Sequence, residues 1–254
     1  MNADLPIAQL IAVFLGAARA GAWLMLCPPF NSRLIPAQVK VLLSIGIALP
    51  MAPYLTASVP SLETSAIIAA TVLQVFVGAA LGFITFVLFA AVQAAGDLLD
   101  VFGGFTLAAA YDPLSMAQSS VFGRFYNLVA VTLLFASDGH QLVLRGFMQS
   151  YKTLPLDASF SMKTFSMVLT DGIGEMFVAA LQIAGPLIAV LFLTDVAFGL
   201  LNRVAPALNA FQLGFPAKIF LVLTLSGTAI AILPQALDGL IDQAVTAVVR
   251  LSGG

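Results

Sequence analysis

The chain has 254 residues, of which 61% are hydrophobic and only 9% are charged, and its mean hydropathy is +1.05. Soluble domains carry roughly 25% charged residues, so this composition excludes a water-soluble globular protein and predicts an integral membrane protein. The formal net charge of -2 comes without the lysine and arginine clusters that neutralise phosphates, which excludes nucleic acid as a partner. The single cysteine excludes an intrachain disulfide and a cysteine-held metal.

The first apolar run, Leu5 to Cys27, is long enough to span a membrane as one helix. No lysine or arginine precedes it, so we expect a retained span rather than a cleaved secretory signal. Arg19 lies just past its midpoint, at a depth where an arginine costs about 2.5 kcal/mol or more. We therefore expect Arg19 to contact a polar partner. The alternative is a side chain that extends to the nearer membrane interface.

The next helix is expected to begin near Ile35 and to break at Pro50 and Pro53, after roughly 20 Å. By contrast, Thr64 to Gly96 carries no charge and would reach about 50 Å as a helix, against a hydrocarbon core of about 30 Å. Phe125 to Ser137 is short again. Such mixed lengths predict kinked helices that bury their excess apolar length against partner proteins.

These segments predict an all-α fold: an integral membrane or membrane-associated bundle of about six kinked apolar helices. Gly78 and Gly82 form a Gly-x-x-x-Gly pair, which we interpret as a helix-packing contact. Residues 138–175 are the most polar region and are expected to form a connection outside the membrane. The last third is expected to be a helical hairpin of Met176 to Thr194 and Phe215 to Leu233, stopped by Pro234, with an amphipathic terminal helix after it.

One central stretch, Asp97 to Asp112, is too apolar for an ordinary surface loop. Its two adjacent glycines, Gly103 and Gly104, stand between two phenylalanines. A backbone that bends freely would thus carry two large apolar side chains. This combination predicts a movable hydrophobic stopper.

Residues suited to catalysis are few. Asp97 and Asp100 would share a helix face, which suggests acid–base chemistry or a metal, but we interpret them as a solvated helix end. His140 is the only histidine, which excludes a histidine-rich metal site and favours a structural role. No phosphate-binding glycine loop of the Walker or Rossmann type occurs. We therefore expect a protein that is not an enzyme, with no catalytic residues, no cofactor and no metal.

Several motifs are distributed along the chain: Arg19 with the Cys-Pro-Pro-Phe turn, Ile35-Pro36, Val92-Gln93-Ala94-Ala95-Gly96, Gly104-Phe105, Asp112-Pro113, Gly139-His140, and Gly199 to Lys218. Together they resemble one family, the FliR family of type III secretion export-gate proteins, which comprises flagellar FliR and its counterparts in virulence systems. The likeness spans nearly the whole chain, and overall similarity favours the flagellar branch. Two departures are Ala207, where the family often has glutamine, and Asp138, where it often has glycine.

The resemblance implies a subunit of the type III protein export gate for flagellar biosynthesis. Such a subunit lies in the bacterial inner membrane at the flagellar basal body, with part of the complex projecting to the periplasmic side. Its implied partners are FliP-like and FliQ-like subunits in a helical assembly, other export-apparatus membrane proteins, unfolded exported proteins and membrane lipid. Residues 1–170 would form a FliP-like unit that includes a central plug loop (97–122), and residues 171–254 a FliQ-like hairpin with the amphipathic C-terminal helix.

A pore wide enough for an extended polypeptide would leak ions when idle, and a hydrophobic constriction closes such a pore by dewetting. The alternative role of the central stretch is a re-entrant turn buried against neighbours. The expected plug residues are Phe102, Gly103, Gly104, Phe105, Tyr111, Asp112, Pro113 and Met116. The expected assembly contacts are Arg19, Arg203, Pro206, Asn209, Phe211 and Lys218.

Two other functions remain open from the sequence. One is a small secondary membrane transporter that uses Arg19, Asp97 or Asp195 in an intramembrane charged site. The other is a purely structural nucleus for assembly, with no gating role.

Overall fold

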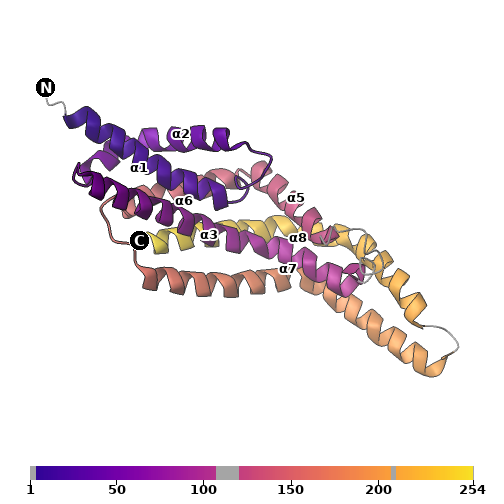
Figure 1. Ribbon diagram of the computed structural model, residues 1–254. Coiled ribbons are helices and arrows are strands. Elements are labelled where there is room, and N and C mark those ends of the chain that lie inside the picture. The colour runs from indigo at the N-terminus through magenta and orange to yellow at the C-terminus, as the bar shows by residue number, and fades with distance from the viewer. Residues whose placement is uncertain (1–3, 107–119, 207–209, 254) are drawn as a thin grey trace. The chain divides into compact units, whose positions relative to one another are not determined.

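The computed structural model describes residues 4–106, 120–206 and 210–253 (Figure 1). Within these ranges the chain is helical and forms no strand, so the all-α prediction is confirmed. The elements are α1 (Asp4–Leu26), α2 (Ala37–Leu55), the short 3-10 helix η1 (Thr56–Ser58), α3 (Thr64–Gly103), α5 (Val121–Ala136), α6 (Gly139–Thr153), α7 (Met162–Val204) and α8 (Ala210–Leu251).

Five helices of the described chain are long and apolar enough to cross a membrane, and α5 with α6 would add a sixth as one broken span. The expected bundle of about six apolar helices is confirmed. Three of the helices are very long: α3 has 40 residues, α7 has 43 and α8 has 42. Each would reach about 60 Å, roughly twice the thickness of a hydrocarbon core.

Proline did not end helices where we expected it to. Helix α2 runs through Pro50 and Pro53, and α8 runs through Pro216 and Pro234. The predicted breaks at Pro50 and Pro53 and the predicted stop at Pro234 are therefore wrong. A proline removes one backbone hydrogen bond, whereas ending a helix in an apolar environment leaves several polar groups unpaired. Continuing the helix is the less costly choice.

Two segments that were expected to connect the apolar helices are themselves largely helical. The polar region 138–175 contains α6 and the first residues of α7, and its expected position outside the membrane stays a prediction. The start of the central stretch, from Asp97 to Gly103, is the end of α3. The predicted loop therefore does not begin at residue 97: α3 continues to Gly103, Gly104 forms a turn, and Phe105 and Thr106 are again helical.

Packing divides the chain into two units. One consists of Met1–Phe89, Ser137–Ile173 and Leu240–Gly254, and the other of Ala90–Ala136 and Gly174–Gly239. The boundary expected between residues 170 and 171 falls inside α7. No loop marks it, and the division into a FliP-like unit and a FliQ-like hairpin stays a prediction.

Aromatic stacking forms the core of the first unit. Trp23 of α1 is fully buried and stacks on Phe147 of α6, with ring centroids 4.3 Å apart. Helix α1 packs against α2, and α2 against α6. Gly82 of α3 lies against α1, because a Cβ at position 82 would come within 2.9 Å of the Trp23 carbonyl oxygen. This contact confirms the packing role expected for the Gly-x-x-x-Gly pair.

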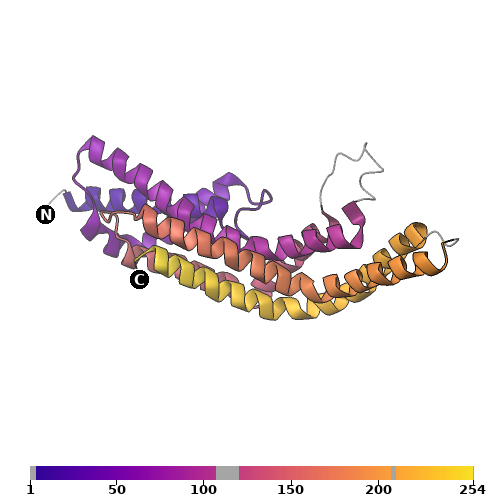
Figure 2. The same cartoon turned by 90° about the horizontal axis from the view of Figure 1, so that it is seen from below.

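Helices α7 and α8 run in opposite directions and lie side by side in both views (Figures 1 and 2). This is the helical hairpin that the two apolar runs of the last third predicted, extended well beyond both runs.

Candidate functional site

Arg19 is fully buried and makes its polar contacts inside the chain. Its Nε donates to Oε1 of Gln74 at 2.6 Å, and its two terminal nitrogens donate to the carbonyl oxygens of Ser150 at 3.2 Å and Leu154 at 2.9 Å. The expectation of a polar partner is confirmed, and the alternative of a side chain extending to the interface is wrong.

The C-terminal end of α6 explains why an arginine is held at this place. A cation near the last carbonyl groups of a helix is favoured by the helix dipole, and Arg19 adds a second donor to the Ser150 carbonyl, which also accepts the Leu154 backbone N–H at 2.9 Å. The Arg19 guanidinium lies 4.9 Å from the centroid of the Tyr151 ring, whose hydroxyl donates to the Gly16 carbonyl at 2.6 Å. Gln74 Nε2 donates to the Leu156 carbonyl at 3.1 Å. Arg19 thus joins α1, α3 and the end of α6, so the predicted role in assembly would act through the fold of this unit.

In the second unit, the N-terminus of α5 is capped by a carboxylate from α3. Asp100 is 2% exposed, and the backbone N–H of Phe122 donates to its two oxygens at 3.1 and 3.3 Å. The Ser120 hydroxyl also donates to Asp100, and it accepts the backbone N–H of Gly123 at 2.7 Å. The interpretation of Asp100 as part of a solvated helix end is therefore wrong. We call the contacts of Asp100, Ser120, Phe122 and Gly123 the α3–α5 joint.

Helices α3 and α5 touch backbone to backbone beside this joint. A Cβ at Gly96 would lie 2.5 Å from the backbone of Phe122. Asp97 is half-buried, and its Oδ1 has no hydrogen-bond partner in the described part of the chain. Within the same ranges, no group of three histidine, cysteine, aspartate or glutamate side chains could hold a metal ion.

The two glycines expected to act as a hinge are both buried in close contacts. A Cβ at Gly103 would lie 2.9 Å from Cγ2 of Val222 in α8. Gly104 has a φ of 86°, a left-handed conformation that suits glycine, and a Cβ there would lie 3.1 Å from the Phe215 ring. Gly104 therefore turns the chain away from α3, while both glycines let α8 side chains approach the backbone.

The described aromatic plug residues have different surroundings. Phe102 is 38% exposed at the end of α3. Phe105 packs edge-on against Phe122, which itself is 5% exposed, with ring centroids 5.3 Å apart. Phe105 is thus supported by the first turn of α5, whereas Phe102 is free to contact another molecule. The remaining expected plug residues, Tyr111, Asp112, Pro113 and Met116, lie outside the described residues.

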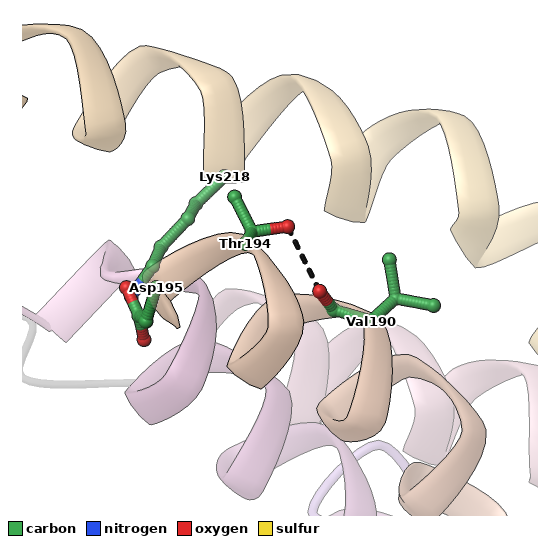
Figure 3. Close-up of polar contacts among 4 residues, drawn as sticks. All are labelled: Val190, Thr194, Asp195 and Lys218. Carbon is green, nitrogen blue, oxygen red and sulfur yellow. Dashed lines mark hydrogen bonds and ion pairs between the residues drawn. The ribbon is translucent and has the colours of Figure 1, made fainter. Parts of the chain in front are cut away.

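Lys218 pairs with a carboxylate of its own hairpin. It extends from α8 to Asp195 on α7, and Nζ lies 2.5 Å from Oδ1 (Figure 3). The neighbouring Thr194 donates its hydroxyl to the Val190 carbonyl at 2.8 Å within α7. Asp195 is 51% exposed, and exposed pairs contribute about 0–1 kcal/mol, so the pair adds little to stability.

The described residues among the other expected assembly contacts lie at the end of α7 and the start of α8. Arg203, in the last turn of α7, and Pro206 are both exposed, as a contact with a partner would require. Asn209 lies outside the described residues, and Phe211 lies in the first turn of α8. Their role in assembly stays a prediction.

Two polar contacts were missed in the sequence, although a signal existed for each. Gln74 is a polar residue within the long uncharged segment, where polar side chains usually find an interhelical partner. Ser120 directly precedes α5, and serine is a favoured N-cap residue. No pattern in the sequence indicated that Asp100 would reach the same helix end.

Comparison with known proteins settles the family. A model of the family described as bacterial export proteins, family 1, matches residues 10–244. The chain belongs to this family. The resemblance to FliR export-gate proteins is therefore confirmed.

Relatives of this export protein carry flagellar and secretion names. The chain is 31% identical over 216 residues to the flagellar biosynthetic protein FliR of Pectobacterium carotovorum subsp. carotovorum, and the match covers 85% of this chain and 83% of that protein. It is 33% identical over 202 residues to FliR of Escherichia coli strain K12, covering 79% and 77%. The secretion system apparatus protein SsaT of Salmonella typhimurium strain LT2 is 31% identical over 151 residues, covering 59% and 58%.

The export protein is thus a membrane-embedded subunit of a flagellar type III export apparatus, as its sequence predicted. A subunit of this kind acts together with other components of the apparatus. The alternative of a small secondary transporter is not favoured.

Proposed function

We propose that the chain forms part of the conduit of the flagellar type III export gate and seals it when no substrate passes. The observation that carries the proposal is the family match over residues 10–244, joined to an aromatic pair at the end of α3. The seal would act on ions, and the substrate would be an unfolded protein. Its mechanism would be binding and exclusion of water, without catalysis.

The two phenylalanines divide the sealing task. The ring of Phe105 packs against the ring of Phe122, so Phe105 has a fixed position relative to α5. Phe102 keeps 38% of its surface free, which suits an apolar side chain that closes a passage or contacts a neighbouring subunit. We call Phe102 and Phe105 the sealing residues.

We further propose FliP-like and FliQ-like subunits as the immediate partners, with residues 1–170 taking the FliP-like position and residues 171–254 the FliQ-like position. The exposed Arg203 and Pro206 would contact these partners. Helices of about 60 Å exceed the hydrocarbon core, which supports a complex that projects beyond the lipid, and we propose that it projects on the periplasmic side.

The transporter alternative would need an unoccupied charged group at mid-membrane depth. Arg19 does not provide one, because Gln74 and two carbonyl groups already use its donors, and Asp195 is paired with Lys218. Of the three candidates, only Asp97 keeps an oxygen without a partner among the described residues. A purely structural role in assembly differs from the proposal only in that the chain would not seal the conduit. Ion flux through the assembled gate distinguishes the two roles.

The partners can be tested by purification. The chain is expressed alone and together with FliP-like and FliQ-like subunits, and detergent extracts are compared by size and composition. We expect a stable complex that contains all three proteins in the second case. A monomer that binds a small solute by itself, and that does not join the other two, would contradict the proposed function.

A further inference from the structure

The sealing residues follow closely after a carboxylate of α3 that fastens this helix to α5. Asp100 stands near the end of α3, and Ser120 stands 20 residues later at the start of α5. Asp100 accepts hydrogen bonds from the Ser120 hydroxyl and from the Phe122 backbone N–H. The two ends of the intervening segment are thus held at one point.

Burial makes this contact strong. At 2% exposure, the Asp100 carboxylate has lost most of its contact with solvent, so its hydrogen bonds are not exchanged for water. It also lies at a helix N-terminus, where the first backbone N–H groups have no partner within the helix and need an acceptor. Removing either the Asp100 carboxylate or its donors would leave a buried polar group without a hydrogen bond, which lowers stability.

The joint leads directly to the aromatic pair. Asp100 holds the backbone of Phe122, and the ring of Phe122 supports the ring of Phe105 at a centroid distance of 5.3 Å. On the other side, Gly104 turns the chain toward Phe105 with a φ of 86° and accommodates the Phe215 ring. The position of Phe105 therefore depends on α5, and the position of α5 depends on Asp100.

We propose that Asp100 is a positioning residue for the seal: by capping α5 it keeps Phe122, and through it Phe105, in the place where the seal forms. The inference rests on the proposed sealing function. Asp100 itself needs no contact with ions or with exported protein. Only its ability to accept hydrogen bonds matters, so an asparagine, whose amide oxygen also accepts, should replace it.

The test compares Asp100→Ala with Asp100→Asn in the gate assembled with its partner subunits. The first readout is hydrogen exchange of the Phe122 backbone N–H, and the second is ion flux through the complex in vesicles. We expect Asp100→Ala to speed the exchange by about tenfold, the loss typical of a missing N-cap, and to raise ion flux. Asp100→Asn should leave both near the wild-type values.

A third variant, Phe102→Ala/Phe105→Ala, distinguishes a failure of the positioning role of Asp100 from a failure of the proposed seal. If this double variant leaks while Asp100→Ala exchanges faster without leaking, the positioning role is overturned and the proposed seal stands. If neither variant leaks, the seal itself is overturned. Unchanged exchange in Asp100→Ala would show that the carboxylate does not cap α5.

If Asp100→Ala prevents the gate from assembling, a milder variant, Ser120→Ala, can be measured in its place. Ser120→Ala removes one hydrogen bond to Asp100 and keeps the cap on Phe122. We expect its exchange and its ion flux to fall between the wild-type and Asp100→Ala values. Wild-type flux in Ser120→Ala, together with faster exchange at Phe122, would overturn the positioning role.

Discussion

Gly78 of α3 lies so close to Arg19 of α1 that a Cβ at position 78 would overlap the Arg19 carbonyl oxygen. The atoms in the way belong to backbone, which cannot rotate aside as a side chain can. We therefore expect Gly78→Ala to separate the two helices and to lower the free energy of unfolding by about 1–3 kcal/mol, as in other overpacked sites. Thermal unfolding of the detergent-solubilised protein measures the change.

Gly46 of α2 is a matched control, because nothing lies within 4 Å of a Cβ built there. Gly46→Ala should leave stability unchanged or raise it by about 0.5–1 kcal/mol through helix propensity. If Gly46→Ala and Gly78→Ala lost the same stability, the close approach of α1 and α3 would be refuted.

Arg19 is predicted to be essential for the fold of its unit. Arg19→Leu leaves Gln74 Oε1 and the Leu154 carbonyl without their buried donor, at a cost of about 3 kcal/mol, while the Ser150 carbonyl keeps the Leu154 backbone N–H. We expect lower thermal stability and a lower yield of the complex with the partner subunits. Arg33→Leu, at an exposed position, is the control and should change neither quantity. Full stability and yield in Arg19→Leu would contradict this account.

Cys27 is predicted to react slowly with thiol reagents. It is fully buried, so a reagent cannot reach its thiol until the protein unfolds. Maleimide labelling should be slow in the folded protein and fast in denaturant. Equal rates in both states would show that Cys27 is accessible.

Asp138 occupies a left-handed backbone conformation, with a φ of 57°, between α5 and α6. Glycine adopts this conformation without strain, whereas alanine pays roughly 1 kcal/mol for it. Asp138→Gly should thus stay within about 0.5 kcal/mol of the wild type, since it loses only an exposed hydrogen bond to Gln141. Asp138→Ala should be clearly less stable. Thermal unfolding compares the two, and the reverse order would contradict the backbone geometry.

The same conformation explains a departure seen in the sequence. Resemblance to the family indicated a glycine at position 138, and the structure gives the physical reason: the chain must adopt a positive φ there. Aspartate is one of the few other residues that tolerate this. Here the sequence contained the signal, but the backbone was needed to interpret it.

Hydropathy predicted the membrane class and the number of spans, because burial in an apolar solvent depends on composition over long windows. Helix ends were harder. Pro50 and Pro234 should have ended helices by the rules for water-soluble proteins, yet both lie inside helices. In lipid or against other protein, backbone pairing outweighs the local effect of one proline.

Contacts between distant residues were the least predictable part. The depth of Arg19 indicated that it needs a polar partner, but only the fold brings Gln74 and the end of α6 to it. Asp100 looked like a surface residue because its helix was expected to end in solvent. Its real partner, Ser120, is 20 residues away, beyond the reach of any local pattern.

The sealing residues are tested most directly by the ion flux of the assembled gate in vesicles. The double variant Phe102→Ala/Phe105→Ala is compared with the wild type and with Phe83→Ala/Phe86→Ala, which removes two partly exposed phenylalanines of the same helix. We expect the Phe102/Phe105 double variant to raise flux on the order of tenfold, because a passage without its apolar constriction stays wet. The control should match the wild type. Equal flux in all three proteins would contradict the seal.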